Sequence, residues 1–268
     1  MSEESERGTS PMQLNPRDIE SQRVQEGIAI WFLGGPSLAI RSERSLLYLD
    51  LFTGPSPAPD VVTKAIPEII DPDLIQKVDI AISTHHDEDH CNHHALSRLH
   101  ENTSCLFFGP VSCNKLYQDW DFDLARRRQI APYESFTKGD AAIHAFPSKD
   151  VFDPDAVTYV IEVGGVTLFD GGDTLHFPDL AEIGEAWDLD IALLSYAKSP
   201  PGEVYYMDEE AVLVAARDLD AKILILKHFD LWKEFEIDPS PLVEQLRSVG
   251  HDARTFELGE CFEYRGRA

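Results

Sequence analysis

Donor side chains are concentrated in the run Ser83-Thr84-His85-His86-Asp87-Glu88-Asp89-His90. The run contains three imidazoles and three carboxylates, and these two ligand types together suit a divalent transition metal. The alternative is a solvated polar loop. Histidine is an uncommon loop residue, however, and several of these side chains would then lack hydrogen-bond partners. The run therefore predicts a metal site, and a bound metal can activate water for hydrolysis.

A short apolar segment explains how this run is held in place. The residues Val78-Asp79-Ile80-Ala81-Ile82 are rich in β-branched side chains and predict a buried strand. The donor-rich run would then lie in the loop at the C-terminal end of that strand. Loops that a rigid strand positions are where ligand-binding side chains collect.

The donor-rich run resembles the metal-binding signature T-H-x-H-x-D-H of the metallo-β-lactamase fold. The residues in register with it are Thr84, His85, Asp89 and His90. Asp87 stands where the family has its second histidine. His86 is an alternative ligand, but a shift of one residue would turn its side chain elsewhere, so Asp87 is the favoured one.

Further blocks of the chain resemble, in the same order, those of the manganese-dependent L-ascorbate-6-phosphate lactonase group within this superfamily. The blocks are Trp31-Phe32-Leu33-Gly34-Gly35, Gly109-Pro110-Val111-Ser112-Cys113, Gly172-Asp173-Thr174, Ser195-Tyr196 and His228-Phe229-Asp230-Leu231-Trp232. With the histidine motif they span most of the chain between residues 28 and 232. This ordered set is more specific than the histidine motif alone.

The resemblance implies a set of metal ligands made of three imidazoles and four carboxylates. The set is His85, Asp87, Asp89, His90, Asp150, Asp173 and His228. It implies one half formed by His85, Asp87 and Asp150, and another formed by Asp89, His90 and His228, with Asp173 between them. Such an oxygen-rich set favours manganese and leaves zinc or iron open. Four carboxylates would overcharge one divalent ion, so either two ions bind or some aspartates support the site or act as bases.

The resemblance also implies a reaction, which is hydrolysis of a lactone or another ester-like bond in a small molecule. The metal would lower the pKa of a water to ~7 and polarise the scissile bond, and the predicted catalytic residues are Asp89 and Asp173. Tyr196 and Lys198 are candidates for binding an anionic substrate group, although Lys198 could equally be a surface residue. Two alternatives stay open, a phosphodiesterase of the same fold and a non-catalytic metal-binding relative whose site Asp87 has degraded.

The elements that must position these residues follow from hydrophobic periodicity. Strands are expected at residues 28–33, 38–40, 46–50, 78–82, 105–108, 141–146, 158–163, 166–170, 189–194 and 222–226, and helices at 92–100, from about 110, from 208 and at 240–249. Gly164-Gly165 predicts a tight hairpin, whereas other strands alternate with helices. The predicted fold is therefore α/β (α+β), a four-layer αβ/βα metallo-β-lactamase sandwich with the site between the two sheets.

Several residues near the site have two interpretations. Asp50 is either a support for the site or a strand-end cap, and residues 52–72 are either a lid or a plain surface loop. The histidines expected to be exposed or structural are His93, His94 and His100, and His144 is expected to be a packed or hydrogen-bonded core residue.

Composition limits the partners and the compartment. The formal net charge of −25 argues against a nucleic-acid partner, although small anionic substrates could bind where metal charge dominates. No apolar run is long enough for a membrane span. Residues 1–26 lack a secretory signal. They predict a mobile tail, which precedes one hydrolase domain at residues 27–268. Four cysteines without C-x-x-C spacing favour reduced thiols in a cytoplasmic protein. The sequence leaves a homo-oligomer open.

Overall fold

Two seven-stranded sheets form the centre of the computed structural model, which describes residues 13–266. The first has the order β14-β1-β2-β3-β4-β5-β6, and its strands are β1 (Ile28–Gly34), β2 (Ser37–Arg41), β3 (Leu46–Leu49), β4 (Ile80–Ile82), β5 (Leu106–Gly109), β6 (Arg127–Gln129) and β14 (Cys261–Tyr264). The second has the order β13-β12-β11-β10-β9-β8-β7, and its strands are β7 (Ser135–Lys138), β8 (Ala141–Pro147), β9 (Val157–Val163), β10 (Val166–Asp170), β11 (Ile191–Ser195), β12 (Ile223–Lys227) and β13 (Asp252–Arg254).

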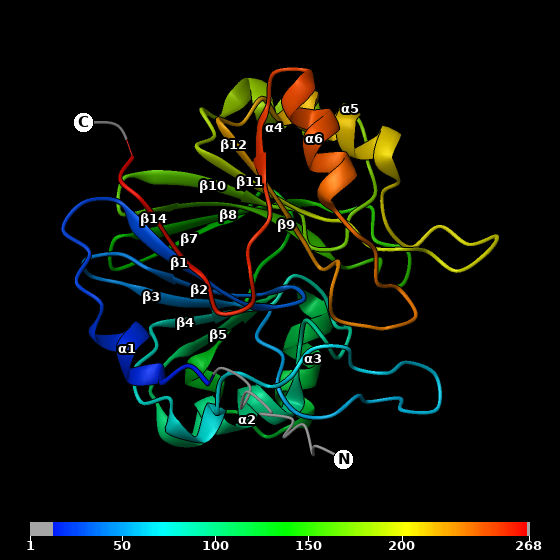
Figure 1. Cartoon of the computed structure of the whole chain (residues 1–268). Helices are drawn as coiled ribbons and strands as arrows, with labels where there is room; N and C mark the ends of the chain where they lie inside the picture. The colour runs from blue at the N-terminus through cyan, green and yellow to red at the C-terminus, as the bar shows by residue number, and fades with distance from the viewer. Residues whose placement is uncertain (1–12, 267–268) are drawn as a thin grey trace, which may run out of the picture.

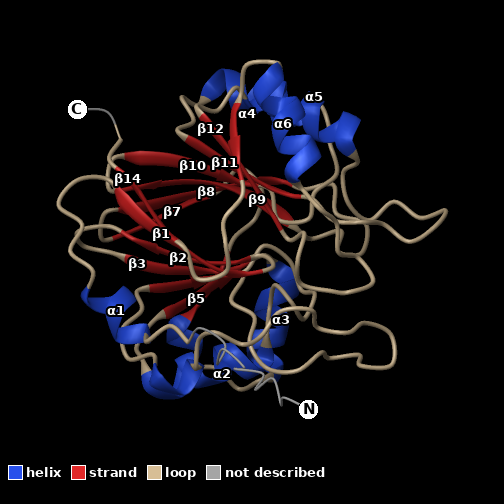
Figure 2. Ribbon diagram, in the orientation of Figure 1, coloured by secondary structure: helices blue, strands red, loops and turns tan. Residues whose placement is uncertain are grey.

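Helices cover the outer face of each sheet (Figures 1 and 2). On the side of the first sheet they are α1 (Pro16–Ser21), α2 (His93–Asn102) and α3 (Val111–Asp119), and on the side of the second they are α4 (Asp179–Ala186), α5 (Glu209–Leu219) and α6 (Ser240–Ser248). Two short 3₁₀ turns lie at Pro72–Leu74 and Leu124–Arg126. The helix, sheet, sheet and helix layers confirm the predicted four-layer sandwich.

Strand periodicity explains the three apolar layers. In β12, Ile223 and Ile225 join the cluster between the sheets, whereas Leu224 and Leu226 pack in the cluster beneath the helices of the second sheet. Successive side chains of a strand point to opposite faces, so a strand that is apolar throughout is buried on both sides. The third cluster lies between the first sheet and its helices and includes Tyr48 and Phe107.

Parallel pairing puts the site loops at one end of the sandwich. Strands β3, β4, β5 and β6 run parallel to one another, as do β10, β11, β12 and β13, while the outer hairpins are antiparallel. The carboxyl ends of parallel strands meet at one edge of a sheet, which is where α/β proteins bind ligands. The hairpin of β9 and β10 pairs across Gly164-Gly165 as predicted, with Val163 opposite Val166.

Residues 13–26 correct the predicted mobile tail. The Asn15 side chain accepts a hydrogen bond from the Arg17 amide at 3.1 Å, and Pro16 opens α1. Ile19 is fully buried in the cluster beneath the first sheet, and Leu14 bridges to Ile70. The buried side chain and the backbone bridge offset the entropy of ordering this segment. The rest of the predicted tail, residues 1–12, lies outside the described residues.

The segment at residues 52–72 docks on the chain that follows β12. The Ala65 amide donates to the Leu231 carbonyl at 2.7 Å, and the Lys233 amide donates to the Thr63 carbonyl at 2.9 Å. The Phe52 ring lies edge-on to Trp232, with 5.5 Å between ring centroids. These contacts hold the segment against the loop that follows β12, at the edge of the site.

Between residues 13 and 266, no helix combines the length and the hydropathy that crossing a membrane requires.

Candidate metal centre

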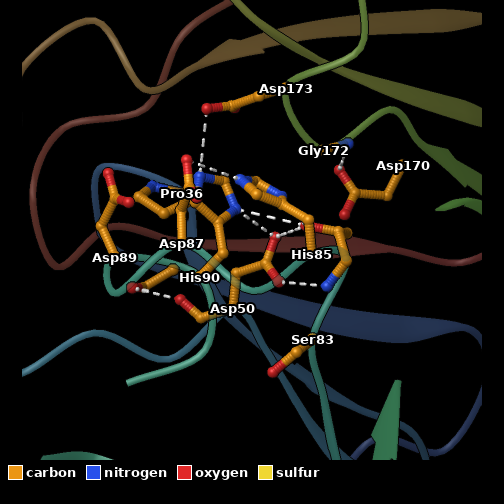
Figure 3. Close-up of polar contacts among 12 residues, drawn as sticks. Pro36, Asp50, Ser83, His85, Asp87, Asp89, His90, Asp170, Gly172 and Asp173 are labelled. Atoms are coloured by element: carbon orange, nitrogen blue, oxygen red, sulfur yellow. Dashed lines mark hydrogen bonds and ion pairs between the residues drawn. The ribbon is translucent and has the colours of Figure 1, made fainter. Parts of the chain in front are cut away.

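Five of the seven predicted ligands converge at one point between the sheets. The side chains of His85, His90 and Asp173 bring one donor atom each within 4.8 Å of one another, and so do Asp89, His90 and His228. Figure 3 shows the His85 and His90 rings together, with Asp173 approaching from the opposite side. His90 belongs to both groups. The second group matches one predicted half of the site, whereas His85 lies with His90 and Asp173.

Loops from both sheets carry these side chains. His85, Asp89 and His90 follow β4, Asp173 follows β10, and His228 follows β12. The Nε2 atoms of His90 and His228 are 3.1 Å apart although the residues come from different sheets. Asp173 Oδ2 lies 3.2 Å from Nε2 of His90 and 3.6 Å from Nε2 of His228. The sandwich thus brings distant parts of the chain to one site, as the motif order predicts.

The first-sheet histidines are oriented from behind by Asp50 and Thr84. The Nδ1 of His90 donates to Asp50 Oδ2 at 2.9 Å, which leaves Nε2 directed into the site. The Thr84 hydroxyl donates its single proton to Asp50 at 3.0 Å, so it accepts from Nδ1 of His85, also at 3.0 Å. When they are neutral, both imidazoles therefore direct an unprotonated Nε2 inward, and this is the form that can bind a metal. Asp50 is a support for the site, the first of its two interpretations.

The loop that carries Asp173 approaches Thr84 very closely. Gly172 has φ +54°, and a Cβ atom at this position would lie 2.9 Å from Cβ of Thr84. Glycine is needed here both for the left-handed backbone and for the close approach. The packing of Gly172 on Thr84 fixes how far Asp173 reaches into the site.

Two residues of the site have left-handed backbones although they are not glycine. Asp50 has φ 46° and His228 has φ 70°. Each such residue costs of order 1–3 kcal/mol and is held by its surroundings, commonly at functional sites. The Asp50 amide donates to the Ile82 carbonyl at 2.8 Å, and the His228 amide donates to the Gly35 carbonyl at 3.1 Å. The strain turns both side chains inward at the ends of their strands.

A buried lysine lies under the site. Lys227 has no exposed surface, and its Nζ lies 2.9 Å from Asp170 Oδ1 and 3.8 Å from Asp50 Oδ2. Burial would lower the pKa of Lys227, but the charges of Asp170 and Asp50 raise it, so the ammonium group stays charged. Its charge compensates the carboxylates that would otherwise be buried without a cation.

Asp89 is held by a tryptophan. Trp232 Nε1 donates to Asp89 Oδ2 at 2.9 Å, and the same oxygen is 3.3 Å from Nε2 of His228. Burial would raise the pKa of Asp89, but the His228 hydrogen bond and the charges of His90 and His228 bring it below its ordinary range. Burial would likewise raise the pKa of Asp173, and the charges of His90 and His228 lower it. Both carboxylates are therefore anionic at neutral pH.

Asp87 and Asp150 flank the converging group. Asp87 Oδ2 lies 3.6 Å from Nε2 of His85, and the Asp87 side chain is 34% exposed. Asp150 Oδ1 accepts the amides of Phe152 and Asp153 at 2.8 and 2.6 Å. Burial raises the pKa of Asp150, which the nearby charge of His85 partly offsets. The assignment of Asp87 and Asp150 as ligands stays a prediction.

His86 is directed toward a different partner. Its Nδ1 lies 2.7 Å from Asp153 Oδ2, and its amide donates to the same oxygen at 3.0 Å. Ser112 also donates to this oxygen at 2.6 Å. The buried Asp153 thus holds His86 beside the site, and this contact supports the predicted register of the loop.

The converging donors fit a metal ion. His85 Nε2 and Asp173 Oδ1 are buried and have no hydrogen-bond partner among the described residues. Buried polar atoms are nearly always paired. In addition, the Nε2 atoms of His90 and His228 face each other at 3.1 Å. A divalent cation would satisfy all of these donors together. The ligand types, imidazole and carboxylate, suit manganese, iron or zinc.

Other candidate residues have local partners. Tyr196 donates to Glu209 at 3.0 Å and is buried, so it is not available to a substrate, and Lys198 is exposed. His144 pairs with Ser135 and Glu162 as expected of a hydrogen-bonded residue. Sequence reasoning misses Lys227, Asp170 and Asp153. The sequence marks the first two only as charged residues that end buried strands, which does not reveal that they pair with each other.

Comparison with known proteins agrees with this geometry. The chain matches the family model described as Beta-lactamase superfamily domain over residues 55–229. It is 25% identical over 269 residues to the Escherichia fergusonii protein named "Probable L-ascorbate-6-phosphate lactonase UlaG", covering 84% of this chain and 76% of that relative. The relative's name supports the prediction of a hydrolytic enzyme.

Solved structures show the same fold. Igni18, described as a novel metallo hydrolase from Ignicoccus hospitalis, superposes with a TM-score of 0.71 at 20% identity, over 88% of this chain and 99% of that one. The isothiocyanate hydrolase from Delia radicum gut bacteria superposes with a TM-score of 0.71 at 15% identity, over 89% of this chain and 100% of that one. Since the family match also covers more than half of the sequence, this chain belongs to the β-lactamase superfamily and has its metallo-hydrolase sandwich fold.

Proposed function

We propose that the chain is a metal-dependent hydrolase that opens a lactone or another ester-like bond in a small molecule. The observation that carries this proposal is the convergence of His85, His90, His228, Asp89 and Asp173 with donor atoms left unpaired. The lactone is favoured by the ordered sequence blocks and by the name of the curated relative. A divalent ion held there would supply Lewis acidity, which activates water and polarises the scissile carbonyl.

The surrounding residues divide the remaining tasks. Asp89 and Asp173 stay anionic and can accept hydrogen bonds from an attacking water, which orients it. Burial raises the pKa of Asp150, so it is better suited than Asp89 or Asp173 to carry the proton that the water loses. Asp50 and Thr84 keep the imidazoles oriented during turnover.

We further propose that manganese is the preferred ion, because Asp87 and Asp150 would add oxygen ligands to Asp89 and Asp173. Zinc and iron are the competing ions, and the site would hold one or two. The free cysteines and the acidic surface support a cytoplasmic enzyme that acts on small molecules and does not bind nucleic acid. Elemental analysis of the purified protein would identify the ion and its number per chain.

A substrate panel tests the reaction. Purified protein is assayed with lactones and with bis(p-nitrophenyl) phosphate, with and without added manganese. Metal-dependent opening of lactones at rates above those of the phosphodiester supports the proposal. Turnover of the phosphodiester alone would identify the phosphodiesterase alternative, and metal binding without turnover of either would identify the non-catalytic one.

A further inference from the structure

Four aromatic side chains form a continuous path from the metal centre to the surface. We call them the aromatic run, and they are Tyr206, Phe235, Tyr205 and Phe152. The ring of Tyr206 lies 5.4 Å from that of His228, and Phe235 lies 6.4 Å from Tyr206 and 6.3 Å from Tyr205. Tyr205 meets Phe152 edge-on, with 4.8 Å between centroids.

The run changes from buried to exposed along its length. Tyr206, at the inner end, is 9% exposed, whereas Phe152, at the outer end, is 52% exposed. Its neighbours Val151 and Val204 are also exposed. Exposed apolar side chains that cluster beside a site commonly mark a binding surface.

Three loops supply the run, and each is fixed by backbone hydrogen bonds. The amides of Tyr205 and Tyr206 donate to Ser199 Oγ at 3.0 and 3.2 Å. The Phe235 carbonyl accepts the Lys198 amide at 2.8 Å, and Asp150 accepts the Phe152 amide at 2.8 Å. In Figure 1 the yellow loop that contains residues 199–207 and the orange loop that follows β12 leave the sandwich at the same end. The rings are therefore positioned before any ligand arrives.

The position of Tyr206 ties the run to the reaction site. Its ring contacts that of His228, and burial together with the nearby charges of Asp173 and Asp89 raises the pKa of its hydroxyl. The inner end of the run thus lies beside the residues that would hold the metal, and the outer end faces solvent. A molecule whose reactive bond lies at His228 and whose substituent extends outward would lie along these rings.

We propose that the aromatic run binds an apolar, preferably aromatic, substituent of the substrate, so that the site prefers a lactone with such a group over an unsubstituted one. This inference rests on the proposed function, since it assumes that the reactive bond lies at the same metal centre. Offset and edge-to-face contacts with aromatic rings stabilise a bound ring beyond the area that it buries. The run accordingly sets the specificity of the site and takes no part in the bond-breaking step.

The test compares two lactones that differ only in the substituent. For the metal-loaded protein, kcat/KM for γ-(4-phenylbutyl)-γ-butyrolactone, whose substituent can extend along the run, is expected to exceed that for γ-butyrolactone by about tenfold. Phe152→Ala removes the outer ring, and it is expected to reduce this ratio about three- to tenfold. Phe152 is exposed, so its replacement has little effect on folding.

A matched control is available in Tyr133, an exposed aromatic residue that makes an edge-on contact with Phe146 elsewhere in the molecule. Tyr133→Ala is expected to leave the ratio unchanged. A ratio near one for the unmodified protein would overturn the proposal, and so would a ratio that Phe152→Ala and Tyr133→Ala change equally.

A binding measurement separates this inference from the proposed reaction. Calorimetry with 5-(4-phenylbutyl)-2-pyrrolidinone and 2-pyrrolidinone, the lactam counterparts, reports the same preference without turnover. If no lactone is hydrolysed, the proposed function fails, but tighter binding of the phenylbutyl lactam that Phe152→Ala weakens would still support the aromatic run. Equal binding of the two lactams would overturn it whatever the enzyme hydrolyses.

Discussion

The chain contains two neighbouring groups of histidines with different environments. In the loop at residues 85–90, His85 and His90 are buried and direct Nε2 toward Asp173 and His228. In and around α2, His93 and His94 are exposed and His100 is partly buried. His93 packs on Trp120, and His100 stacks on Phe122. The same residue type thus builds a candidate metal centre in one place and local packing contacts a few residues later.

The difference lies in what surrounds the second nitrogen of each ring. In the loop, Thr84 and Asp50 contact the Nδ1 atoms of His85 and His90, so the Nε2 atoms are directed into the site, where that of His90 lies 3.1 Å from Nε2 of His228. In α2, Nδ1 of His94 lies 2.9 Å from the Thr53 hydroxyl, and Nε2 of His100 accepts the Asp123 amide at 3.1 Å. A group that fixes the tautomer and direction of an imidazole prepares it for a metal, but ligation also needs further donors at the other nitrogen, and among the described residues such donors converge on His85 and His90. Histidine content alone does not distinguish the two groups.

Removing the histidine shared by both donor groups should have the largest effect. His90→Ala is expected to lower metal affinity by more than about 100-fold, because a lost ligand should cost more than a lost supporting group, for which 10–100-fold is typical. Metal content after dialysis checks this, with circular dichroism to confirm folding. Retention of a full metal complement would show that the two groups of histidines do not differ as described.

Asp50→Asn should have the next largest effect. The amide keeps the shape of the side chain but no longer provides the carboxylate that accepts from His90 Nδ1 and Thr84. We expect metal affinity to fall by about 10–100-fold, with catalytic activity falling in parallel. Titration with manganese or zinc measures the affinity. An unchanged affinity would mean that Asp50 only caps its strand.

Metal binding by the loop should depend on pH, because His90 must lose a proton before it can bind an ion. Burial alone would lower the pKa of His90, but the carboxylates of Asp173 and Asp50 raise it well above 6.5. The metal-free ring is therefore protonated at neutral pH, and a cation must displace that proton. Affinity should increase about tenfold per pH unit until the raised pKa is reached, if one proton is released per ion. Calorimetry in buffers of different ionisation enthalpy counts the protons.

The same shift predicts how the metal-free protein responds to pH. A group whose pKa is raised on folding stabilises the folded state fully below its unfolded value, here 6.5, and loses that contribution as pH rises through the folded value. The melting temperature of metal-free protein should therefore decrease as the pH rises above 6.5. Protein saturated with metal should show a weaker decrease, since the proton is already displaced.

Within the loop itself, Asp87 and His86 provide a finer comparison. Asp87→Ala should weaken metal binding about tenfold if Asp87 is a ligand, and Asp87→His should shift preference toward zinc, because an imidazole replaces an anionic oxygen. His86→Ala should matter much less, since Asp153 holds His86 beside the site. Loss of metal in His86→Ala but not in Asp87→Ala would show that His86 is the ligand and that the predicted register of the loop is wrong by one residue.

The smallest effect should come from α2. His94→Ala removes one contact with Thr53 at an exposed position, so the free energy of unfolding should fall by less than about 1 kcal/mol. Metal content should not change. Thermal denaturation and elemental analysis of the same sample measure both quantities. A variant that lost metal would place His94 in the site after all.

Sequence patterns predicted the parts of this molecule that depend on local order. The buried strands that carry the site read as apolar runs, and His85, Asp173 and His228 each follow one of them. Short polar strands such as β6 and β7 have no such pattern, because they form by pairing with neighbouring strands and not through an apolar sequence of their own. Helix α1 was missed for a related reason, since one buried isoleucine anchors an otherwise polar segment.

The supporting residues could not be assigned from sequence, because their roles depend on contacts between distant segments. Lys227 looks like the polar end of a strand until Asp170 is brought beside it from β10. Asp153 lies in a loop whose contact with His86 joins residues from the two halves of the sandwich. Motif order locates ligands, whereas the groups that orient them become visible only after the chain folds.

The pairing of β14 with β1 has a consequence for biosynthesis. Strand β1 emerges from the ribosome more than 200 residues before its outer neighbour β14, with Ile28 opposite Tyr264 and Trp31 opposite Cys261. Until residues 261–264 have been translated, the outer edge of β1 presents unpaired backbone groups that could pair with another nascent chain. Ribosomes stalled before residue 261 should therefore yield chains that are more easily cleaved by protease and more prone to aggregate than those stalled beyond β14.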